Sequence, residues 1–193
     1  MLMAPSTRDR MIDAAVDALR RDGVAGMSFT GVLEASGAAR GAIYHHFPGG
    51  KSELVAEAVE RNGRDVSAQL SQLRSGSPES VVKEFTALIR PVVEASAAGS
   101  SCAVAAGAMA GPEQRDRDRL QRTAGDAIAS WIDALRERLE QSGVEPRGAA
   151  ELASLLIATL EGAHVVVRAE RRIEPFDQAA RALEGLVASR YPA

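Results

Sequence analysis

Two adjoining stretches decide the fold: Ser28-Phe-Thr-Gly-Val-Leu-Glu-Ala-Ser-Gly37 and, after two alanines, Arg40-Gly-Ala-Ile-Tyr-His-His-Phe-Pro-Gly-Gly-Lys51. Ser28 is a good helix N-cap, and Gly37 is a typical residue at which a helix stops. A second short helix is expected over about residues 39–47, where Pro48 and the two glycines after it close it. Two short helices separated by a glycine turn predict a helix-turn-helix.

The second of these helices sorts its side chains into two faces. Ile43 and Phe47 are four residues apart and are expected to face the core, with Val32 and Leu33 of the preceding helix. By the same spacing the opposite face carries Arg40, Gly41, Tyr44 and His45. In a helix-turn-helix the second helix enters the major groove of DNA, so the sequence predicts a DNA-reading surface on this face.

Particular side chains suit particular DNA groups. Arg40 can donate two parallel hydrogen bonds to a guanine, and the small Gly41 lets the backbone approach the duplex closely. The Tyr44 hydroxyl can bind a phosphate, and Lys51 would begin the next helix, where its charge and the amide dipoles favour a phosphate.

Each residue also has a simpler interpretation. Arg40 could be a solvated surface arginine, and the ring of Tyr44 could pack on the first helix while its hydroxyl still reaches a phosphate. His45 and His46 could be metal ligands, but adjacent helical side chains diverge and no third ligand stands close in sequence. We therefore expect no metal site.

The quoted stretches, Tyr44 to Lys51 above all, resemble the DNA-binding domain of the tetracycline-repressor (TetR) family and most closely its LmrA/YxaF branch. The resemblance spans about residues 8–58. It implies a set of DNA contacts, with the first and the last on phosphates: Thr30, Arg40, Gly41, Tyr44, His45 and Lys51. Ala42 belongs to the same predicted surface but stands where the family often has Ser or Thr, which argues against a hydroxyl contact there. Gly31 replaces a larger polar residue, which loosens its helix.

The remainder of the chain also indicates helices. Of its 193 residues 46% are hydrophobic and 25% are charged, which is ordinary for a folded protein and excludes an intrinsically disordered one. Apolar residues recur every three to four positions, and no stretch alternates well enough to predict a strand. The prediction is an all-α fold of about nine helices, over about residues 8–23, 28–37, 39–47, 51–73, 78–93, 102–110, 111–143, 149–171 and 176–190.

Two domains are expected: a three-helix DNA-binding domain over residues 1–50 and a helical ligand-binding and dimerisation domain over residues 51–193. Residues 1–51 contain six basic and five acidic side chains, a net charge of +1. The whole chain has a net charge of -3, so the other residues together carry -4. This asymmetry permits a DNA-binding head on an acidic body.

The chain is predicted to be cytoplasmic. One cysteine cannot form an internal disulfide framework, which suits a reducing compartment. No apolar run approaches the ~18 residues that a membrane helix needs, and the first residues do not resemble a signal peptide. No membrane partner is expected.

A homodimer is predicted because one helix-turn-helix reads about half a site and a two-fold dimer reads a palindrome. In TetR-like proteins the last two helices pair with their symmetry mates, so the resemblance implies that their apolar faces form the interface. The alternative is that these faces are buried within one subunit. The predicted interface residues are Leu152, Leu155, Leu156, Thr159, Ala163, Val166, Leu183, Leu186 and Val187.

A small-molecule effector is predicted to bind a mostly apolar pocket between helices of the second domain. The candidate lining residues are Phe85, Leu88, Ile89, Val92, Cys102, Met109, Trp131, Leu135 and His164. Trp131 is equally a core residue by its spacing, and His164 a hydrogen-bonded core or interface histidine. Cys102 is a small buried side chain or, alternatively, a redox sensor.

Together these features predict a TetR-like transcriptional regulator, a repressor that leaves palindromic double-stranded DNA when a small molecule binds. An enzyme is not expected: Cys102 and His164 form the one nucleophile–base pair, and no orienting motif accompanies them. No phosphate-binding glycine loop or cofactor motif is present, so no cofactor is expected. The alternative function is a helical small-molecule-binding protein whose DNA head is non-functional and which acts through a protein partner.

Overall fold

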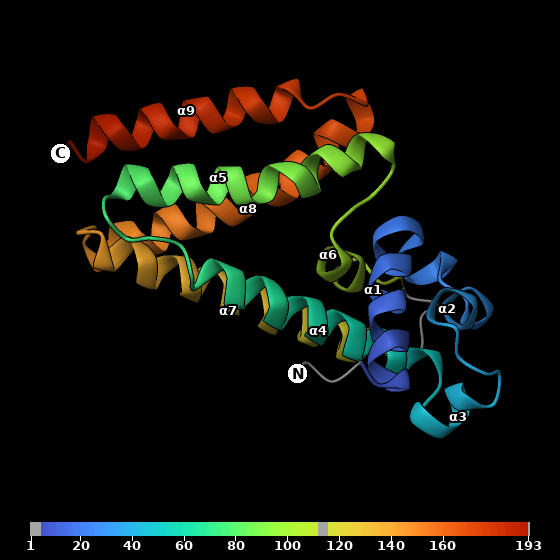
Figure 1. Ribbon diagram of the computed structural model, residues 1–193. Helices are drawn as coiled ribbons and strands as arrows, with labels where there is room; N and C mark the ends of the chain where they lie inside the picture. The colour runs from blue at the N-terminus through green and yellow to red at the C-terminus, as the bar shows by residue number, and fades with distance from the viewer. Residues whose placement is uncertain (1–4, 112–115, 193) are drawn as a thin grey trace. The chain divides into compact units, whose positions relative to one another are not determined.

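The computed structural model describes residues 5–111 and 116–192, and within these ranges every regular element is a helix and none is a strand. This confirms the predicted all-α fold. In chain order the elements are α1 (Thr7–Gly26), α2 (Phe29–Ser36), α3 (Ala42–His46), α4 (Lys51–Leu70), α5 (Pro78–Glu94), the 3-10 helix η1 (Ala95–Ala98), α6 (Ala103–Ala108), α7 (Arg117–Gln141), α8 (Pro146–Glu170) and α9 (Glu174–Arg190) (Figure 1).

The helices form two compact units, and each is described by itself. The first unit comprises Met1–Arg64 and Cys102–Ala127, and the second comprises Asp65–Ser101 and Ile128–Ala193. By backbone contacts, then, the start of α4, α6 and the start of α7 belong with the first three helices. The predicted division after residue 50 is a functional one and stays a prediction.

In the first unit, α1 packs against α2 and α6. The Ser6 hydroxyl caps α1 by accepting a hydrogen bond from the backbone N–H of Asp9. The buried stripe of α1 includes Met11, Ala15 and Leu19, none of which is exposed. The helix was predicted to end at Gly23; the structure instead has a break there, where Gly23 has a φ of 65° in the left-handed region that favours glycine, and α1 ends at Gly26.

The starts of α3 and α7 also differ from prediction. α3 begins at Ala42, three residues later than expected, because residues before it form a turn in which the N–H of Ala42 donates to the carbonyl of Ala39. α7 was expected to open at Gly111 and Pro112; the described part of it begins at Arg117, and residues 112–115 lie outside the described residues.

In the second unit, α5, α8 and α9 pack on one another and run side by side (Figure 1). Ser77 and Ser80 form a capping box at the start of α5, and Pro78 occupies its first turn. Largely apolar side chains fill the core of this unit: Phe85, Trp131, Leu135, Leu156, Val167 and Phe176. Across the α5–α9 contact the Arg90 guanidinium binds both carboxylate oxygens of Asp177 at 3.0 and 3.1 Å.

α8 corrects one expectation from the sequence. Among the described residues it is a helix long and apolar enough, by length and composition, to cross a membrane. The sequence of α8 contains no unbroken apolar run of this length, because Glu161 and Arg168 interrupt it. Only 44% of the apolar window is buried within the chain, although α8 packs on α5, α9 and η1. Part of the apolar surface of α8 is therefore exposed in the single chain.

Candidate nucleic-acid interface

A tight glycine turn connects α2 to the segment that carries α3. Ser28 caps α2 by accepting a hydrogen bond from the N–H of Gly31, at 3.1 Å. Gly37 ends the helix with a φ of 66° and a ψ of 21°, a conformation that favours glycine. Ile43 and Phe47 then hold α3 in the core of the unit, with 2% and 0% of their surface exposed. The local geometry is that of the predicted helix-turn-helix.

The opposite face of α3 points to solvent. Tyr44 and His45 of the helix are exposed, as are Arg40 and Gly41, which directly precede it, and Tyr44 has 69% of its surface exposed. Its ring meets the edge of Phe29 from α2, with ring centroids 6.2 Å apart, an arrangement that restricts the ring without covering it. We call the exposed surface of residues 40, 41, 44 and 45 the reading face.

Gly41 stands on the reading face without a structural reason to be glycine. Its φ of -69° and ψ of -20° are helical values that any residue adopts, and a Cβ built there would meet no atom within 4 Å. Gly50, by contrast, has a φ of 74° and needs to be glycine for its turn. Within the described chain, therefore, neither packing nor backbone conformation requires a glycine at position 41.

The remaining predicted DNA contacts surround the reading face. Thr30 is exposed near the start of α2, and Ala42 is half-buried at the start of α3. Lys51 is the first residue of α4 and donates from Nζ to the carbonyl of Ala25 at 3.4 Å. Burial lowers the pKa of the Lys51 ammonium. Lys51 also lines a pocket of about 290 Å³ in the first unit, beside Gly50 and Leu120.

The predicted dimer residues divide into two groups. Leu155, Thr159, Val166 and Leu186 are wholly or partly exposed on α8 and α9, whereas the other five are buried within the chain: Leu152, Leu156, Ala163, Leu183 and Val187. Leu155 and Leu186 also line an apolar pocket of about 220 Å³ that reaches Tyr191. Exposed residues that the sequence interpretation missed continue this face along α8, notably Ala158 and Val165. We call the exposed apolar surface of residues 155, 158, 159, 165, 166 and 186 the α8–α9 face.

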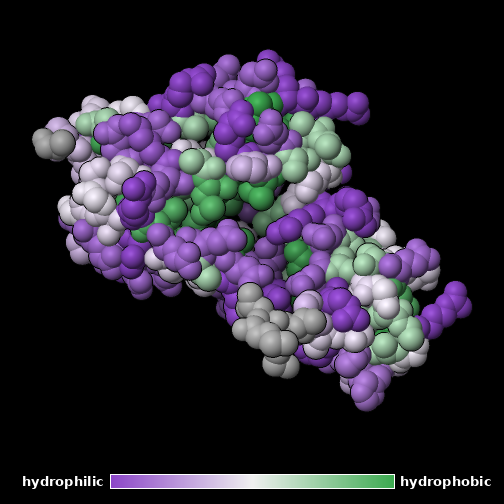
Figure 2. Space-filling view, viewed as in Figure 1, coloured by the Kyte–Doolittle hydropathy of each residue, from purple (hydrophilic) through white to green (hydrophobic). Residues whose placement is uncertain are grey.

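The predicted effector residues are not all in one unit. Cys102 and Met109 lie in the first unit, and the other seven in the second. Phe85, Trp131 and Leu135 are fully buried, while Leu88 and Val92 retain exposed area on α5. In the space-filling view apolar side chains gather over α5 (Figure 2). Ile89, the residue that follows Leu88 on α5, is buried.

Two polar candidates from the effector set have defined partners. The Nδ1 atom of His164 and the hydroxyl of Ser96 share a hydrogen bond of 2.7 Å, buried between α8 and η1. His164 thus occupies a hydrogen-bonded interior position, as the simpler interpretation supposed. Cys102 is buried at the N-cap of α6, where its sulfur accepts from the N–H of Ala105 at 3.4 Å.

Metal ligation has no support in the part of the chain that the structure describes, where no three His, Cys, Asp or Glu side chains are grouped to hold an ion. His45 and His46 stack edge to face, with ring centroids 4.9 Å apart.

The described residues show a short exposed helix that follows a glycine turn and is held by two buried side chains. In an all-helical chain, this arrangement defines a helix-turn-helix protein.

Comparison with known sequences assigns the family. The family described as bacterial regulatory proteins, tetR family, matches residues 11–58, and the family described as the LmrA/YxaF-like C-terminal domain of transcriptional regulators matches residues 78–182. Rv0196 of Mycobacterium tuberculosis, an uncharacterised HTH-type transcriptional regulator, is 32% identical over 96% of both chains. LmrA of Bacillus subtilis, an HTH-type transcriptional regulator, is 24% identical over 81% of this chain and 83% of its own.

Solved structures agree in fold. A TetR transcriptional regulator from Legionella pneumophila superposes with a TM-score of 0.80 at 20% identity, over 96% of this chain and 98% of that one. CifR, a TetR-family regulator solved with a 26-bp double-strand operator DNA, gives a TM-score of 0.67 at 17% identity, over 95% and 97%. The chain belongs to the TetR family of transcriptional regulators, in its LmrA/YxaF-like branch. Because this family consists of regulators, the expectation that the chain is not an enzyme is confirmed.

Proposed function

We propose that this regulator binds a palindromic operator in double-stranded DNA through the reading face of α3. The observation that carries the proposal is the division of α3 into two faces: Ile43 and Phe47 are buried, and the residues on the other side are exposed. Arg40 and His45 supply hydrogen-bond donors for guanine edges, and Gly41 allows close approach. Operator binding by the structural relative CifR supports the same role for this chain.

Selection of a duplex from a random library by the purified full chain tests this proposal. We expect a two-fold-related sequence to be enriched and to bind at least ~10³-fold more tightly than a scrambled duplex of the same composition. Arg40→Ala should remove most of this preference while leaving weak, salt-sensitive binding. Enrichment of no sequence would overturn the proposal and favour the alternative function, a small-molecule-binding protein that acts through a protein partner.

The DNA-binding form is proposed to be a homodimer joined through the α8–α9 face. Large apolar side chains are exposed there, with Leu186 at 55% and Val165 at 67%, and such a surface on a globular chain is typical of an interface. Dimerisation would bury it and would also account for the membrane-like composition of α8. A two-fold dimer supplies the two heads that a palindrome requires.

The oligomeric state tests this interface directly. Light scattering should give twice the chain mass for the wild type and the chain mass for the double variant with Leu155→Glu and Leu186→Glu. Ala87→Glu, which adds a charge at an exposed position of α5, serves as the control and should remain dimeric. A double variant that stays dimeric would place the interface elsewhere.

Repression relieved by a small molecule is the proposed regulation, with α5 supplying part of an apolar pocket. Leu88 and Val92 present apolar surface there, and Phe85 and Ile89 lie buried beside them. An effector shifts the protein away from its DNA-binding form only if it binds the two forms with different affinity. Trp131 is the single tryptophan and is buried, so its fluorescence reports on effector binding in this unit. Compounds that change this emission should also weaken operator binding; compounds that change it with no effect on DNA affinity would refute the coupling.

The cytoplasm is the proposed location, because a regulator that reads operator DNA acts where the DNA is. Fractionation of cells that express the full chain should recover it with the soluble proteins. Recovery in the membrane fraction would instead assign α8 to a bilayer.

A further inference from the structure

The start of α1 carries alternating charges that reach three other helices of the first unit. The Arg10 Nε donates to the carbonyl of Ser36, the last residue of α2, at 3.1 Å. The Arg61 guanidinium, from α4, lies 3.4 Å from a carboxylate oxygen of Asp9 and 3.4 Å from one of Asp13. α1 is thus joined to α2 by a hydrogen bond and to α4 by ion pairs.

Arg8 makes the contact that involves the reading helix. Its Nη2 atom lies 2.5 Å from Oε2 of Glu57 on α4, and its guanidinium carbon stands 5.3 Å from the centre of the Phe47 ring. Phe47 is the C-cap of α3 and is fully buried, so its ring fixes the end of that helix. One guanidinium therefore contacts both α4 and the residue that closes α3.

The charge of Arg8 stabilises the ionised form of the Glu57 carboxylate. This carboxylate is mostly buried, with 19% of the side chain exposed, and burial raises the pKa of Glu57 while Arg8 acts in the opposite direction. Without a neighbouring cation the carboxylate would be poorly solvated. Arg8, with 44% of its side chain exposed, supplies the charge at the edge of the unit.

We propose that Arg8 is a positioning residue for DNA recognition, which holds the end of α3 against α4 through Phe47 and Glu57 without contacting a base. This inference rests on the proposed reading of DNA by α3. Loss of Arg8 would let α3 adopt several orientations, so that fewer base contacts form together. Contacts to the phosphate backbone, which carry no sequence information, would be retained.

The size of the effect follows from the contacts. The ion pair of Arg8 with Glu57 is half-exposed only on its arginine side, and one cation–π contact is modest, so together they predict a loss of about three- to tenfold in the ratio of specific to non-specific affinity. The competing explanation is that Arg8 itself binds a phosphate. That would lower affinity for every sequence and reduce the salt dependence by about one phosphate contact.

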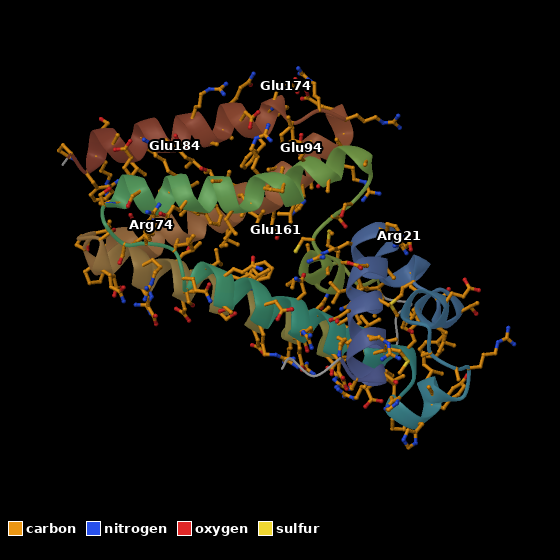
Figure 3. All side chains as sticks on the ribbon, viewed as in Figure 1. Arg21, Arg74, Glu94, Glu161, Glu174 and Glu184 are labelled. Carbon is orange, nitrogen blue, oxygen red and sulfur yellow. The ribbon has the colours of Figure 1, made fainter. Side chains whose placement is uncertain are left out.

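The experiment measures affinity for the selected duplex and for a scrambled duplex over a range of salt concentrations. We expect Arg8→Gln to lower the specificity ratio, Glu57→Gln to lower it by less because the contact of Arg8 with Phe47 remains, the double variant to be no worse than Arg8→Gln, and the salt slopes to stay unchanged. Arg8→Lys, which keeps the charge but lacks the planar guanidinium, should fall between Arg8→Gln and the wild type. Arg21→Gln is the matched control: Arg21 lies on the same helix at the end far from α3 and pairs with Asp22 (Figure 3).

Glu57→Gln distinguishes the positioning role of Arg8 from a phosphate contact, because the two explanations predict opposite changes in DNA affinity for this variant. Were Arg8 a phosphate ligand, Glu57→Gln would remove a repelling charge and tighten binding to both duplexes, and that result would overturn the proposal. An unchanged ratio in Arg8→Gln would overturn it as well. Thermal melts check folding, and Arg8→Lys keeps the test valid if Arg8→Gln does not melt cooperatively. A wild type that selects no duplex would instead refute the proposed function.

Discussion

Replacing Gly41 with alanine should separate folding from DNA binding, because it adds one methyl group to the reading face. The helical φ and ψ of Gly41 suit alanine, and nothing lies within 4 Å of the added Cβ. The free energy of unfolding should therefore change by less than about 1 kcal/mol. On DNA the methyl group would hold α3 away from the duplex, and the loss of one good base contact weakens binding by about 1–3 kcal/mol, or about 5–150-fold.

Gly125→Ala is the matched control, since Gly125 is an exposed glycine of α7 that also has no atom within 4 Å of an added Cβ. Fluorescence anisotropy on the selected duplex and urea denaturation should be run on both variants. We expect normal stability in both and weakened operator binding in Gly41→Ala alone. Full operator affinity in Gly41→Ala would show that α3 does not approach DNA through this position, and the reasoning about the reading face would fail.

Three further perturbations follow from other contacts. Lys51→Ala should weaken binding to all DNA sequences and reduce the salt slope by about one phosphate contact; equal slopes in the variant and the wild type would exclude that contact. Ser96→Ala removes the buried hydrogen-bond partner of His164 Nδ1 and should cost about 1–3 kcal/mol of stability in urea denaturation, whereas an unchanged midpoint and slope would contradict it. A hydrogen bond from the backbone N–H of Arg74 lowers the pKa of Glu84, so this carboxylate stabilises the fold above its ordinary pKa of 4.5 and loses that effect as the pH falls below it. Thermal melts over a pH series should therefore show Glu84→Gln less stable than the wild type at neutral pH and equal to it in acid; a gap that persists in acid would refute this assignment.

The helix-turn-helix was predictable from the sequence because its signals are local. Ser28 caps α2, Gly37 takes the left-handed conformation, and Ile43 and Phe47 are buried, all as their spacing and residue types indicated. Each of these features depends on a few neighbouring residues. The late start of α3 was not predictable, because Ala39 closes a turn in a stretch whose residues are compatible with helix.

Features that depend on contacts between residues far apart in the chain could not be predicted from the sequence. The contact of Lys51 with the carbonyl of Ala25, and that of Arg8 with Phe47, join residues far apart in the chain. On α8 the sequence showed one broad apolar stripe and could not tell the buried Leu156 from the exposed Leu155 beside it. Adjacent residues on a helix diverge by about 100°, so only the position of the neighbouring helices decides which is covered.

The central claim is that Arg40 reads a guanine in each half-site, and base-analogue substitution tests it most directly. 7-Deazaguanine lacks the N7 acceptor but pairs normally, and it can replace one guanine at a time in the selected duplex. At the contacted guanine the wild type should lose about tenfold or more in affinity, while Arg40→Ala should bind the altered and unaltered duplexes equally. Equal losses in both proteins, or no loss at any guanine in the wild type, would contradict the account.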